Sequence, residues 1–454
     1  MSPKPAQTVI VGGGPTGSLL AILLARRGIE AVVLEREPAW SRQRQPEGRS
    51  INLALAARGI QALQAADAYT AVAALAIPMR GRMLHEAGMP QRFAPYGQHP
   101  QDCIYSISRA DLHLALYRLA TREYGVEYRF EHECTHVDAA ARRLRVTSSS
   151  GERELEFAVL FGCDGAGSQV RRALSEAGMV AASEELLDHG YKEFHIPPTA
   201  ADEYALDPSA LHIWPRGDFM LIALPNLDRS FTATLFLPLE GEIGFASLTT
   251  ETIGDFFARE FPDAGMLMPE LENEFATHPT GSLGTIRCEP FSAAGRVLLL
   301  GDAGHAIVPF HGQGMNAAFE DCFALDGLVA MHGPSWAPVS SAFDSERRPN
   351  ARAIATMALE NYAEMRDQVR DPGFNLRLEL GLELERRFPN RFVPRYAMVM
   401  FHPEISYATA QQRGRVQAQI LQRLTRGVRS LEDVDFELAA ELIDTQLHPT
   451  PGGL

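Results

Sequence analysis

The alternation of short apolar runs and glycine-rich turns predicts a βαβ unit at the start of the chain. Residues 8–11 are a short apolar run, Gly12-x-Gly14-x-x-Gly17 follows, and residues 31–34 are a second apolar run. Between them, one apolar helix face is formed by Leu19, Leu20, Leu23 and Leu24, before Gly28. This spacing predicts a strand, a helix ending near Gly28, and a second strand parallel to the first.

The chemistry expected of this unit is dinucleotide binding. Its glycines allow a tight turn, close approach of a pyrophosphate, and close packing of helix on strand. The helix N-terminus carries partial positive charge that suits phosphates. Glu35, at the end of the second strand, can accept hydrogen bonds from ribose hydroxyls. A glycine-rich turn without a ligand is the alternative, but strand, glycines, helix, second strand and acid all fall in register.

Two later segments carry polar residues where predicted elements meet. Arg109 directly precedes a helix with an apolar face at Leu112, Leu116 and Leu119, although such an arginine could also be a solvated helix start. A hairpin turning at residues 149–151 feeds a buried strand that ends at Asp164-Gly165, after which Ser168 and Arg171 open a helix. Taken alone, Asp164-Gly165 would be an ordinary turn.

The stretch 211–236 changes to strand character. Three apolar runs separated by polar turns predict an antiparallel meander. Period-two alternation places Ile222 and Leu224 on one face and Phe219 and Leu221 on the other. Both faces are apolar, so both are expected to be covered, either as a pocket wall or as plain core. From about Trp336 onward the pattern is helical.

A second pair of turns lies between Val297 and Asp321. Residues 297–300 predict a strand that rejoins the first sheet, with Asp302 at its carboxyl end, where open α/β sheets bind ligands. Asp302 can hold a ribityl or ribose hydroxyl. Gly312 and Gly314 predict a helix N-terminus that stabilises negative charge on a flavin ring. Two unrelated turns are the alternative.

Composition narrows the functional classes. The chain has 454 residues, which predicts two to three domains, and a net charge of -15, which argues against nucleic acid or an anionic membrane as its partner. Five scattered cysteines without a C-x-x-C pair argue against a disulfide framework or a zinc site and suit a reducing cytosol. No apolar run approaches 18 residues, so no transmembrane helix is expected.

Three marks in order make the chain resemble the flavoprotein aromatic hydroxylases with one dinucleotide-binding domain. They are Gly12-x-Gly14-x-x-Gly17 with Glu35, Asp164-Gly165 with Ser168 and Arg171, and Gly301-Asp302 with Pro309 and Gly312. Within that class it is similar to the kynurenine 3-monooxygenase family in the stretches 48–59, 79–83, 95–97, 211–236, 308–316, 358–365 and 394–399. Eukaryotic members carry a hydrophobic C-terminal anchor that this chain does not show, so a soluble, cytoplasmic protein is expected.

The resemblance implies an α/β fold. Its parts are a Rossmann-like FAD-binding domain of the para-hydroxybenzoate-hydroxylase type, an antiparallel β-sheet substrate domain and a C-terminal helical region. The expected FAD-binding parts are residues 1–185, with 75–105 contributing to the substrate site, and 286–370. The substrate sheet is expected at 186–285 and the helical region at 371–454. The implied FAD-binding residues are Gly12, Gly14, Pro15, Thr16, Gly17, Glu35, Arg36, Arg109, Asp164, Asp302, Pro309, Gly312, Gly314, Met315 and Asn316.

For the substrate, the resemblance implies a carboxylate held by Arg82 and Tyr96. A guanidinium pairs a carboxylate in bidentate fashion and a phenol adds a hydrogen bond. Asn361 and Tyr396 match polar residues that close the pocket. The expected apolar wall is Leu211, Ile222, Leu224 and Phe236, and the loop over the flavin contains Phe310, His311 and Gln313. His311 is expected to line the pocket, or to be only a loop histidine, and is not assigned as a base.

The implied activity is hydroxylation of L-kynurenine at ring position 3, using FAD, NADPH and O2 through a flavin C4a-hydroperoxide. The substrate's amino group activates its own ring, so no strong acid or base of the protein is expected, and no metal. Only one dinucleotide motif is complete, so NADPH is expected to bind transiently. The open alternatives are a hydroxylase of another aryl amino acid or anthranilate-like acid, a flavin dehydrogenase or reductase, and a non-catalytic flavin module. A monomer or a homodimer fits equally well.

Overall fold

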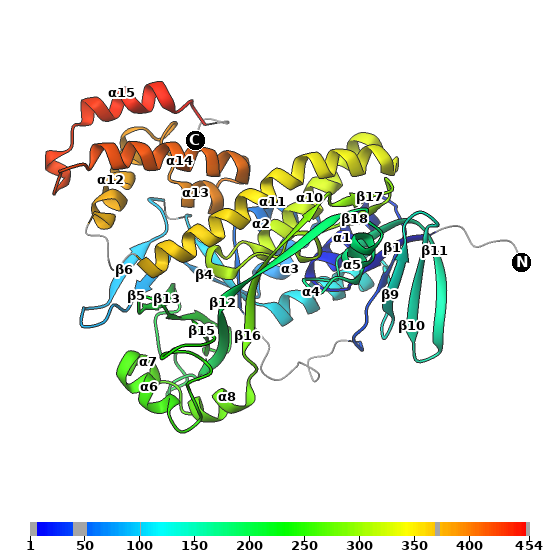
Figure 1. Ribbon diagram of the computed structural model, residues 1–454, viewed down its shortest axis with the longest axis horizontal. Helices are drawn as coiled ribbons and strands as arrows, with labels where there is room; N and C mark the ends of the chain where they lie inside the picture. The colour runs from blue at the N-terminus through cyan, green and yellow to red at the C-terminus, as the bar shows by residue number, and fades with distance from the viewer. Residues whose placement is uncertain (1–6, 40–51, 100, 368–372, 451–454) are drawn as a thin grey trace, which may run out of the picture.

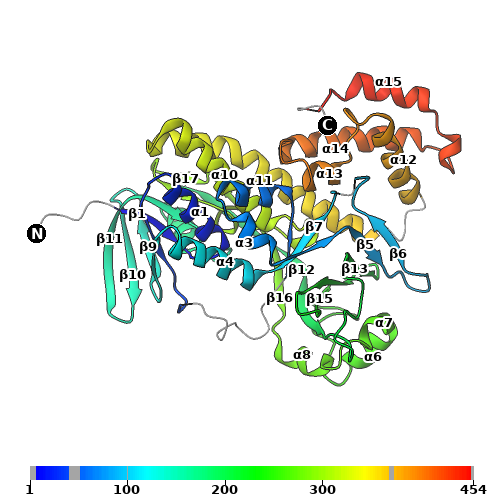
Figure 2. The ribbon, with the colours of Figure 1, turned by 180° about the vertical axis from the view of Figure 1, so that it is seen from behind.

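The computed structural model describes residues 7–39, 52–99, 101–367 and 373–450. The C-terminal helices gather at one end of the molecule, opposite the first large sheet, and the second large sheet lies below the middle (Figures 1 and 2). The stretch 48–59 that supports the resemblance lies partly outside the described residues, at 48–51.

The first sheet contains the predicted βαβ unit. Its strand order is β17 (Ser292–Ala293), β18 (Val297–Leu299), β11 (Gly151–Gly162), β1 (Gln7–Val11), β2 (Ala31–Leu34) and β8 (Glu127–Arg129). Strand β1 pairs in parallel with β2 and β11, and β18 pairs in parallel with β11. Helix α1 (Pro15–Arg26) connects β1 to β2. The predicted unit is therefore confirmed, and so is the return of residues 297–299 to the same sheet.

The hairpin predicted around residues 149–151 is also confirmed. Strands β9 (Glu133–Asp138) and β10 (Arg143–Ser148) pair antiparallel, and β10 pairs antiparallel with the first half of β11. The second half of β11 is buried in the first sheet. Helices α4 (Arg109–Arg122) and α5 (Gln169–Glu176) begin where the sequence predicted them.

The second sheet contains the predicted meander. Its order is β16 (Gly281–Glu289), β12 (Ala181–Ile196), β15 (Phe231–Pro238), β14 (Met220–Pro225), β13 (Ala210–Pro215), β5 (Gly81–Leu84) and β6 (Arg92–Pro95). One face, including Leu221, packs in a core with α6 (Ile253–Glu260), α7 (Pro262–Gly265) and α8 (Leu271–Thr277). The opposite face, with Ile222 and Leu224, lines a cavity. One face is thus core and the other is a pocket wall.

Residues 81–95 join this second sheet through a pairing that the sequence analysis did not predict. Strand β5 lies parallel to β13, with Arg82 opposite Leu211, although the two strands are far apart in the chain. A third sheet of β3 (Asn52–Leu55), β7 (Ile104–Ser108) and β4 (Ala76–Met79) lies beside α2 (Ala57–Ala65) and α3 (Tyr69–Ala73).

The helices predicted after Trp336 are present. They are α11 (Trp336–Asp367), α12 (Phe374–Arg387), α13 (Arg395–Met400), α14 (Tyr407–Leu424) and α15 (Phe436–Gln446). The predicted domain boundaries at 185 and 285 fall inside β12 and β16, and 370 lies outside the described residues. The domain limits therefore stay a prediction.

Candidate active site

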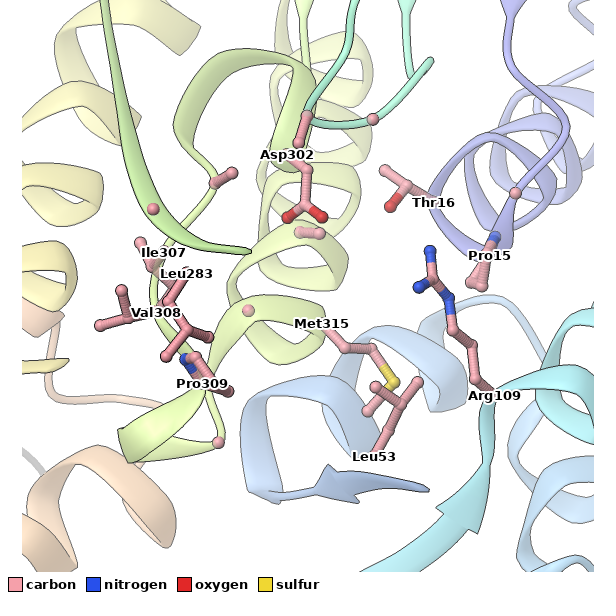
Figure 3. Close-up of a pocket in the computed structure, with 18 of the residues that line it drawn as sticks. Pro15, Thr16, Leu53, Arg109, Leu283, Asp302, Ile307, Val308, Pro309 and Met315 are labelled. Atoms are coloured by element: carbon pink, nitrogen blue, oxygen red, sulfur yellow. The ribbon is translucent and has the colours of Figure 1, made fainter. Parts of the chain in front are cut away.

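A cavity of about 680 Å³ separates the first sheet from the second. Its walls include the carboxyl ends of β1 and β2, the inner face of the meander, and the segment from Leu300 to Met315. Figure 3 shows Asp302, Thr16, Arg109 and Met315 facing this space from different elements. Parallel α/β sheets bind ligands at the carboxyl ends of their strands, so the position is that of a cofactor cleft.

The glycines of the first turn serve two different purposes. A Cβ on Gly12, where φ is +96°, would lie 2.5 Å from the carbonyl oxygen of Cys163, and a Cβ on Gly17 would lie 2.0 Å from that of Gly12. A Cβ on Gly14, by contrast, would point into open space at the cavity. Gly12 and Gly17 therefore allow the chain to fold tightly, and Gly14 leaves space for a ligand beside the N-terminus of α1.

The Glu35 carboxylate is fixed next to this turn by hydrogen bonds from two backbone N–H groups. Its Oε2 accepts a hydrogen bond from the Gly13 N–H at 2.8 Å, and its Oε1 accepts one from Glu37 N–H at 2.8 Å. The carboxylate is buried and lines the cavity. Its remaining lone pairs can accept from ribose hydroxyls, which is the role predicted for it.

His113 completes the turn and was missed by the sequence analysis. Its Nε2 lies 2.7 Å from the carbonyl oxygen of Gly13, which also accepts from Ser18 Oγ at 2.9 Å. A carbonyl can only accept, so Nε2 carries the proton. Burial lowers the pKa of His113 to about 4, and the ring is neutral at neutral pH. These two bonds occupy the Gly13 carbonyl oxygen and attach the turn to α1 and α4.

The Asp164-Gly165 turn is a helix cap as well as a cavity wall. Asp164 accepts hydrogen bonds from Ser168 Oγ at 2.6 Å and Gln169 N–H at 2.8 Å, at the start of α5. Burial raises its pKa above the usual value. Arg171 donates to the carbonyl of Ala303 at 2.8 Å, beside Asp302. The second sequence mark is therefore bonded to the residue that follows the Gly301-Asp302 pair of the third mark.

The second glycine turn is fixed by Asn316. Its Nδ2 donates to the carbonyls of Gly312, at 2.9 Å, and Ala54, at 2.8 Å, and its Oδ1 accepts from Ala56 N–H at 2.9 Å. Gly312 has a φ of +65°, and α10 (Gly314–His332) begins immediately afterwards at the cavity wall. The turn presents a helix N-terminus to the cavity, as predicted.

The far end of the cavity holds an arginine beside two stacked tyrosines. The Arg82 guanidinium carbon lies 4.6 Å from the ring centre of Tyr396 and 5.5 Å from that of Tyr96. The two rings stack at 5.7 Å, and burial raises the pKa of both phenols above their usual value, so both keep their protons. Among the described residues, no carboxylate forms an ion pair with Arg82. This cation is free to bind an anionic ligand.

Apolar residues connect this end to the cofactor cleft. Phe236 and Phe310 meet with ring centres 5.1 Å apart. The other predicted wall residues also line the cavity, namely Leu211, Ile222 and Leu224. The wall combines strands of the second sheet with the loop that carries Pro309 and Phe310. An aromatic ligand anchored at Arg82 would lie against this surface.

His311 lines the cavity and stacks on Tyr396 with ring centres 5.6 Å apart. Burial lowers its pKa to about 4, and its Nδ1 has no hydrogen-bond partner among the described residues. It is therefore a neutral ring in the wall at physiological pH.

Some predicted site residues lie behind the wall rather than in it. Gln313 is fully buried, accepts a hydrogen bond from Tyr407 Oη at 2.7 Å, and places its Nε2 3.0 Å from Met400 Sδ. Asn361 donates to the carbonyl of Phe310 at 2.6 Å. Neither residue lines the cavity, nor do Gly17 and Asn316. These four residues support the wall from behind, and direct ligand contact by Gln313 or Asn361 stays a prediction that this geometry does not favour.

Comparison with known proteins identifies the family. The FAD binding domain family matches residues 5–358. Proteins named kynurenine 3-monooxygenase are 45% identical in Xanthomonas euvesicatoria pv. vesicatoria (strain 85-10), over 100% of both chains, and 44% identical in Myxococcus xanthus (strain DK1622), over 99% of this chain and 97% of that one. The chain belongs to the kynurenine 3-monooxygenase family. It is a flavoprotein monooxygenase with FAD as cofactor and NADPH as co-substrate.

Solved structures of lower identity support the fold of this family member. The 2-methyl-3-hydroxypyridine-5-carboxylic acid oxygenase matches with a TM-score of 0.66 and 19% identity, over 82% of this chain and 95% of that one. PqsL of P. aeruginosa in complex with 2-aminobenzoylacetate matches with a TM-score of 0.63 and 20% identity, over 80% and 98%. Within the described part of the chain, no helix is long and apolar enough to cross a membrane.

Proposed function

We propose that this protein hydroxylates L-kynurenine at ring position 3 to give 3-hydroxy-L-kynurenine, consuming NADPH and O2. The observation that carries the proposal is the Arg82 cation, which has no carboxylate partner among the described residues and lines the cavity beside Tyr96 and Tyr396. A buried charge without a counter-charge is costly, so this end of the cavity is built for an anion. Names of relatives at 43–45% identity support kynurenine as that anion.

The amino-acid end of the substrate is assigned to Arg82 and Tyr96. The guanidinium fork donates two N–H groups to a carboxylate, and the protonated Tyr96 phenol donates a third. Tyr96 Oη is buried without a hydrogen-bond partner of ordinary geometry among the described residues. A bound carboxylate would supply that partner. Tyr396 lies over the guanidinium and restricts the direction from which the anion approaches.

The aromatic end of the substrate is assigned to the apolar wall. Leu211, Ile222, Leu224 and Phe236 hold a ring by contact alone, so the carboxylate anchor and the shape of the wall decide which ring carbon faces the cofactor. FAD, when bound, supplies the reaction with oxygen and the transfer of one oxygen atom to the ring. The residues that would hold it are Gly12, Gly14, Glu35, Arg109 and Asp302, which converge on one side of the same cavity.

The protein's remaining contribution is orientation and exclusion of water. The aniline nitrogen of kynurenine activates the carbon beside it, and the neutral His311 offers no acid at physiological pH. The loop carrying Phe310 is held by Asn361, and Phe310 stacks on Tyr362 at 4.3 Å. An apolar wall that is held in place by these contacts keeps water away from the site where oxygen is transferred to the substrate.

The decisive experiment measures NADPH oxidation by the yellow protein with and without L-kynurenine, and identifies the product by mass. Stimulated oxidation with a product that has gained one oxygen atom is the expected result. Stimulation without an oxygenated product would mean that kynurenine is only an effector, and no stimulation would refute kynurenine as substrate. If L-kynurenine does not stimulate NADPH oxidation, other aryl amino acids and anthranilate-like acids would be tested in the same assay.

A further inference from the structure

Arg58 lies outside the cavity lining, yet it contacts α10 and α13, two helices that each contribute residues to that lining. It is the second residue of α2 and is only 1% exposed. Its guanidinium pairs with Glu320 of α10 and lies 4.0 Å above the ring of Tyr407. A fully buried arginine needs several partners to offset the loss of hydration, and these two account for only part of its donors.

The remaining donors of Arg58 point at the end of α13. Nε lies 3.3 Å from the carbonyl oxygen of Val399, and Nη2 lies 3.5 Å from that of Met398 and also donates to the carbonyl of Ile405. Carbonyls at a helix C-terminus lack partners within the helix and carry partial negative charge. Arg58 therefore caps α13 and the turn that follows it.

Helix α13 carries two residues of the cavity wall. Tyr396, near its start, lies over Arg82, and Met400, at its end, lines the cavity. The cap by Arg58 fixes where this short helix ends. It thereby fixes the distance between Tyr396 and the predicted carboxylate anchor.

On its other side, Arg58 begins an ion network that ends at the Gly301 amide, next to the cofactor cleft. Glu320 also pairs with Arg347 Nη2 at 2.7 Å, and Arg347 Nε pairs with Asp321 Oδ1 at 2.7 Å. Asp321 Oδ2 accepts a hydrogen bond from the Gly301 N–H at 2.8 Å and from His305 Nε2 at 2.6 Å. Gly301 directly precedes Asp302, whose carboxylate faces the cofactor cleft (Figure 3).

We propose that Arg58 is a positioning residue that fixes the substrate anchor relative to the Gly301–Asp302 turn, which we call the cofactor cradle. It acts through α13 on Tyr396, and through Glu320, Arg347 and Asp321 on the Gly301–Asp302 turn. Arginines and acids alternate along this buried network, so losing the Arg58 fork moves Glu320 and, through it, shifts Arg347 and Asp321. The inference rests on the proposed function for the identity of the substrate, but the network itself does not depend on that identity.

The test compares Arg58→Lys with a matched control, Arg413→Lys. Lysine keeps the charge at position 58 but lacks the planar fork that reaches several carbonyls. Arg413 also donates hydrogen bonds to backbone carbonyls, those of Arg391 at 2.6 Å and His448 at 2.8 Å. It does so within the C-terminal region, and it does not line the cavity. Both variants are studied as FAD-loaded proteins, and Glu320→Gln replaces Arg58→Lys if the latter does not fold.

The expected result for Arg58→Lys is a KM for L-kynurenine raised tenfold or more, with a smaller change in the maximal rate of NADPH oxidation. The amount of hydroxylated product formed per NADPH oxidised should fall below half of the wild-type ratio, with the remaining NADPH oxidation yielding hydrogen peroxide from O2. Arg413→Lys should match the wild type in both readouts. A wild-type KM and a wild-type product fraction in folded Arg58→Lys would overturn the proposal.

A second readout does not need the substrate. Hydrogen exchange in the FAD-loaded protein reports the Gly301 amide, which is bonded to Asp321, and the amides of residues 398–405. Arg58→Lys should accelerate exchange at both sites by tenfold or more, and Arg413→Lys at neither. Acceleration at 398–405 alone would refute the link to the cofactor cradle. If wild-type protein ignores L-kynurenine, the proposed function fails while this exchange experiment still decides the role of Arg58.

Discussion

Replacing Arg82 is the most direct test of the carboxylate anchor. In Arg82→Ala the guanidinium is lost from a site that contains two phenols and no carboxylate partner among the described residues. Each charge-assisted hydrogen bond contributes about 1.5–3 kcal/mol. Two such bonds to a bound carboxylate therefore amount to about 3 kcal/mol or more, which corresponds to a rise in Kd of roughly a hundredfold or more. Arg82→Lys retains a point charge, and its Kd for L-kynurenine should rise by only about tenfold.

The assay titrates FAD-loaded protein with L-kynurenine and follows the flavin spectrum. The matched control is Arg80→Ala, because Arg80 lies two residues away, is exposed, and is not part of the cavity lining. A second ligand, kynurenine without its carboxyl group, completes a double-mutant cycle. The wild type should discriminate strongly between the two ligands, and Arg82→Ala should not. Equal losses for both ligands on mutation would refute the contact between Arg82 and the carboxylate.

Three further predictions concern the cofactor turn and the wall. Glu35→Ala should weaken FAD retention at least tenfold, because the Gly13 N–H loses its acceptor together with the ribose contact; full flavin occupancy after dialysis would contradict this. Gly14→Ala should lower FAD affinity without changing the stability of the apoprotein, and Gly17→Ala should destabilise the apoprotein itself, since its Cβ would lie 2.0 Å from a carbonyl oxygen; equal melting temperatures for the two apoproteins would be inconsistent with that geometry. Burial lowers the pKa of His311 from 6.5 to about 4 in the folded protein, so between pH 6.5 and pH 4 the unfolded chain binds a proton at His311 and the folded protein does not. His311 should therefore remove up to about 3 kcal/mol of unfolding free energy between pH 6.5 and pH 4, and His311→Phe should flatten that slope in denaturant titrations; parallel slopes would argue against a buried neutral ring.

The elements that the sequence predicted well are those determined locally. Strand β1, helix α1, the hairpin of β10 and β11, and the meander all follow from apolar period and turn residues within 10 to 30 positions. The convergence of Asp164 and Asp302 on one cleft was also predictable, because both end parallel strands of one sheet.

The features that the sequence did not reveal depend on long-range packing. Arg58, Glu320 and Arg347 lie on three helices, and no local pattern marks a pair of charges that will be buried together. His113 looks like any residue of an amphipathic helix until its ring meets Gly13. Gln313 lies between two turn glycines, yet its side chain points toward Tyr407 and away from the cavity, since adjacent residues of a turn face different directions.

The strand order of the first sheet also governs when the cofactor cleft can exist during synthesis. Strand β1 pairs with residues 157–162 of β11, and β11 in turn pairs with residues 297–299 of β18. Contacts of such sequence separation form late and slowly. The glycine turn near the start of the chain therefore cannot form a complete cofactor cleft until residues beyond Met315 have left the ribosome. Nascent chains shorter than this should not retain flavin, and cofactor capture should mark completion of the first two thirds of the protein.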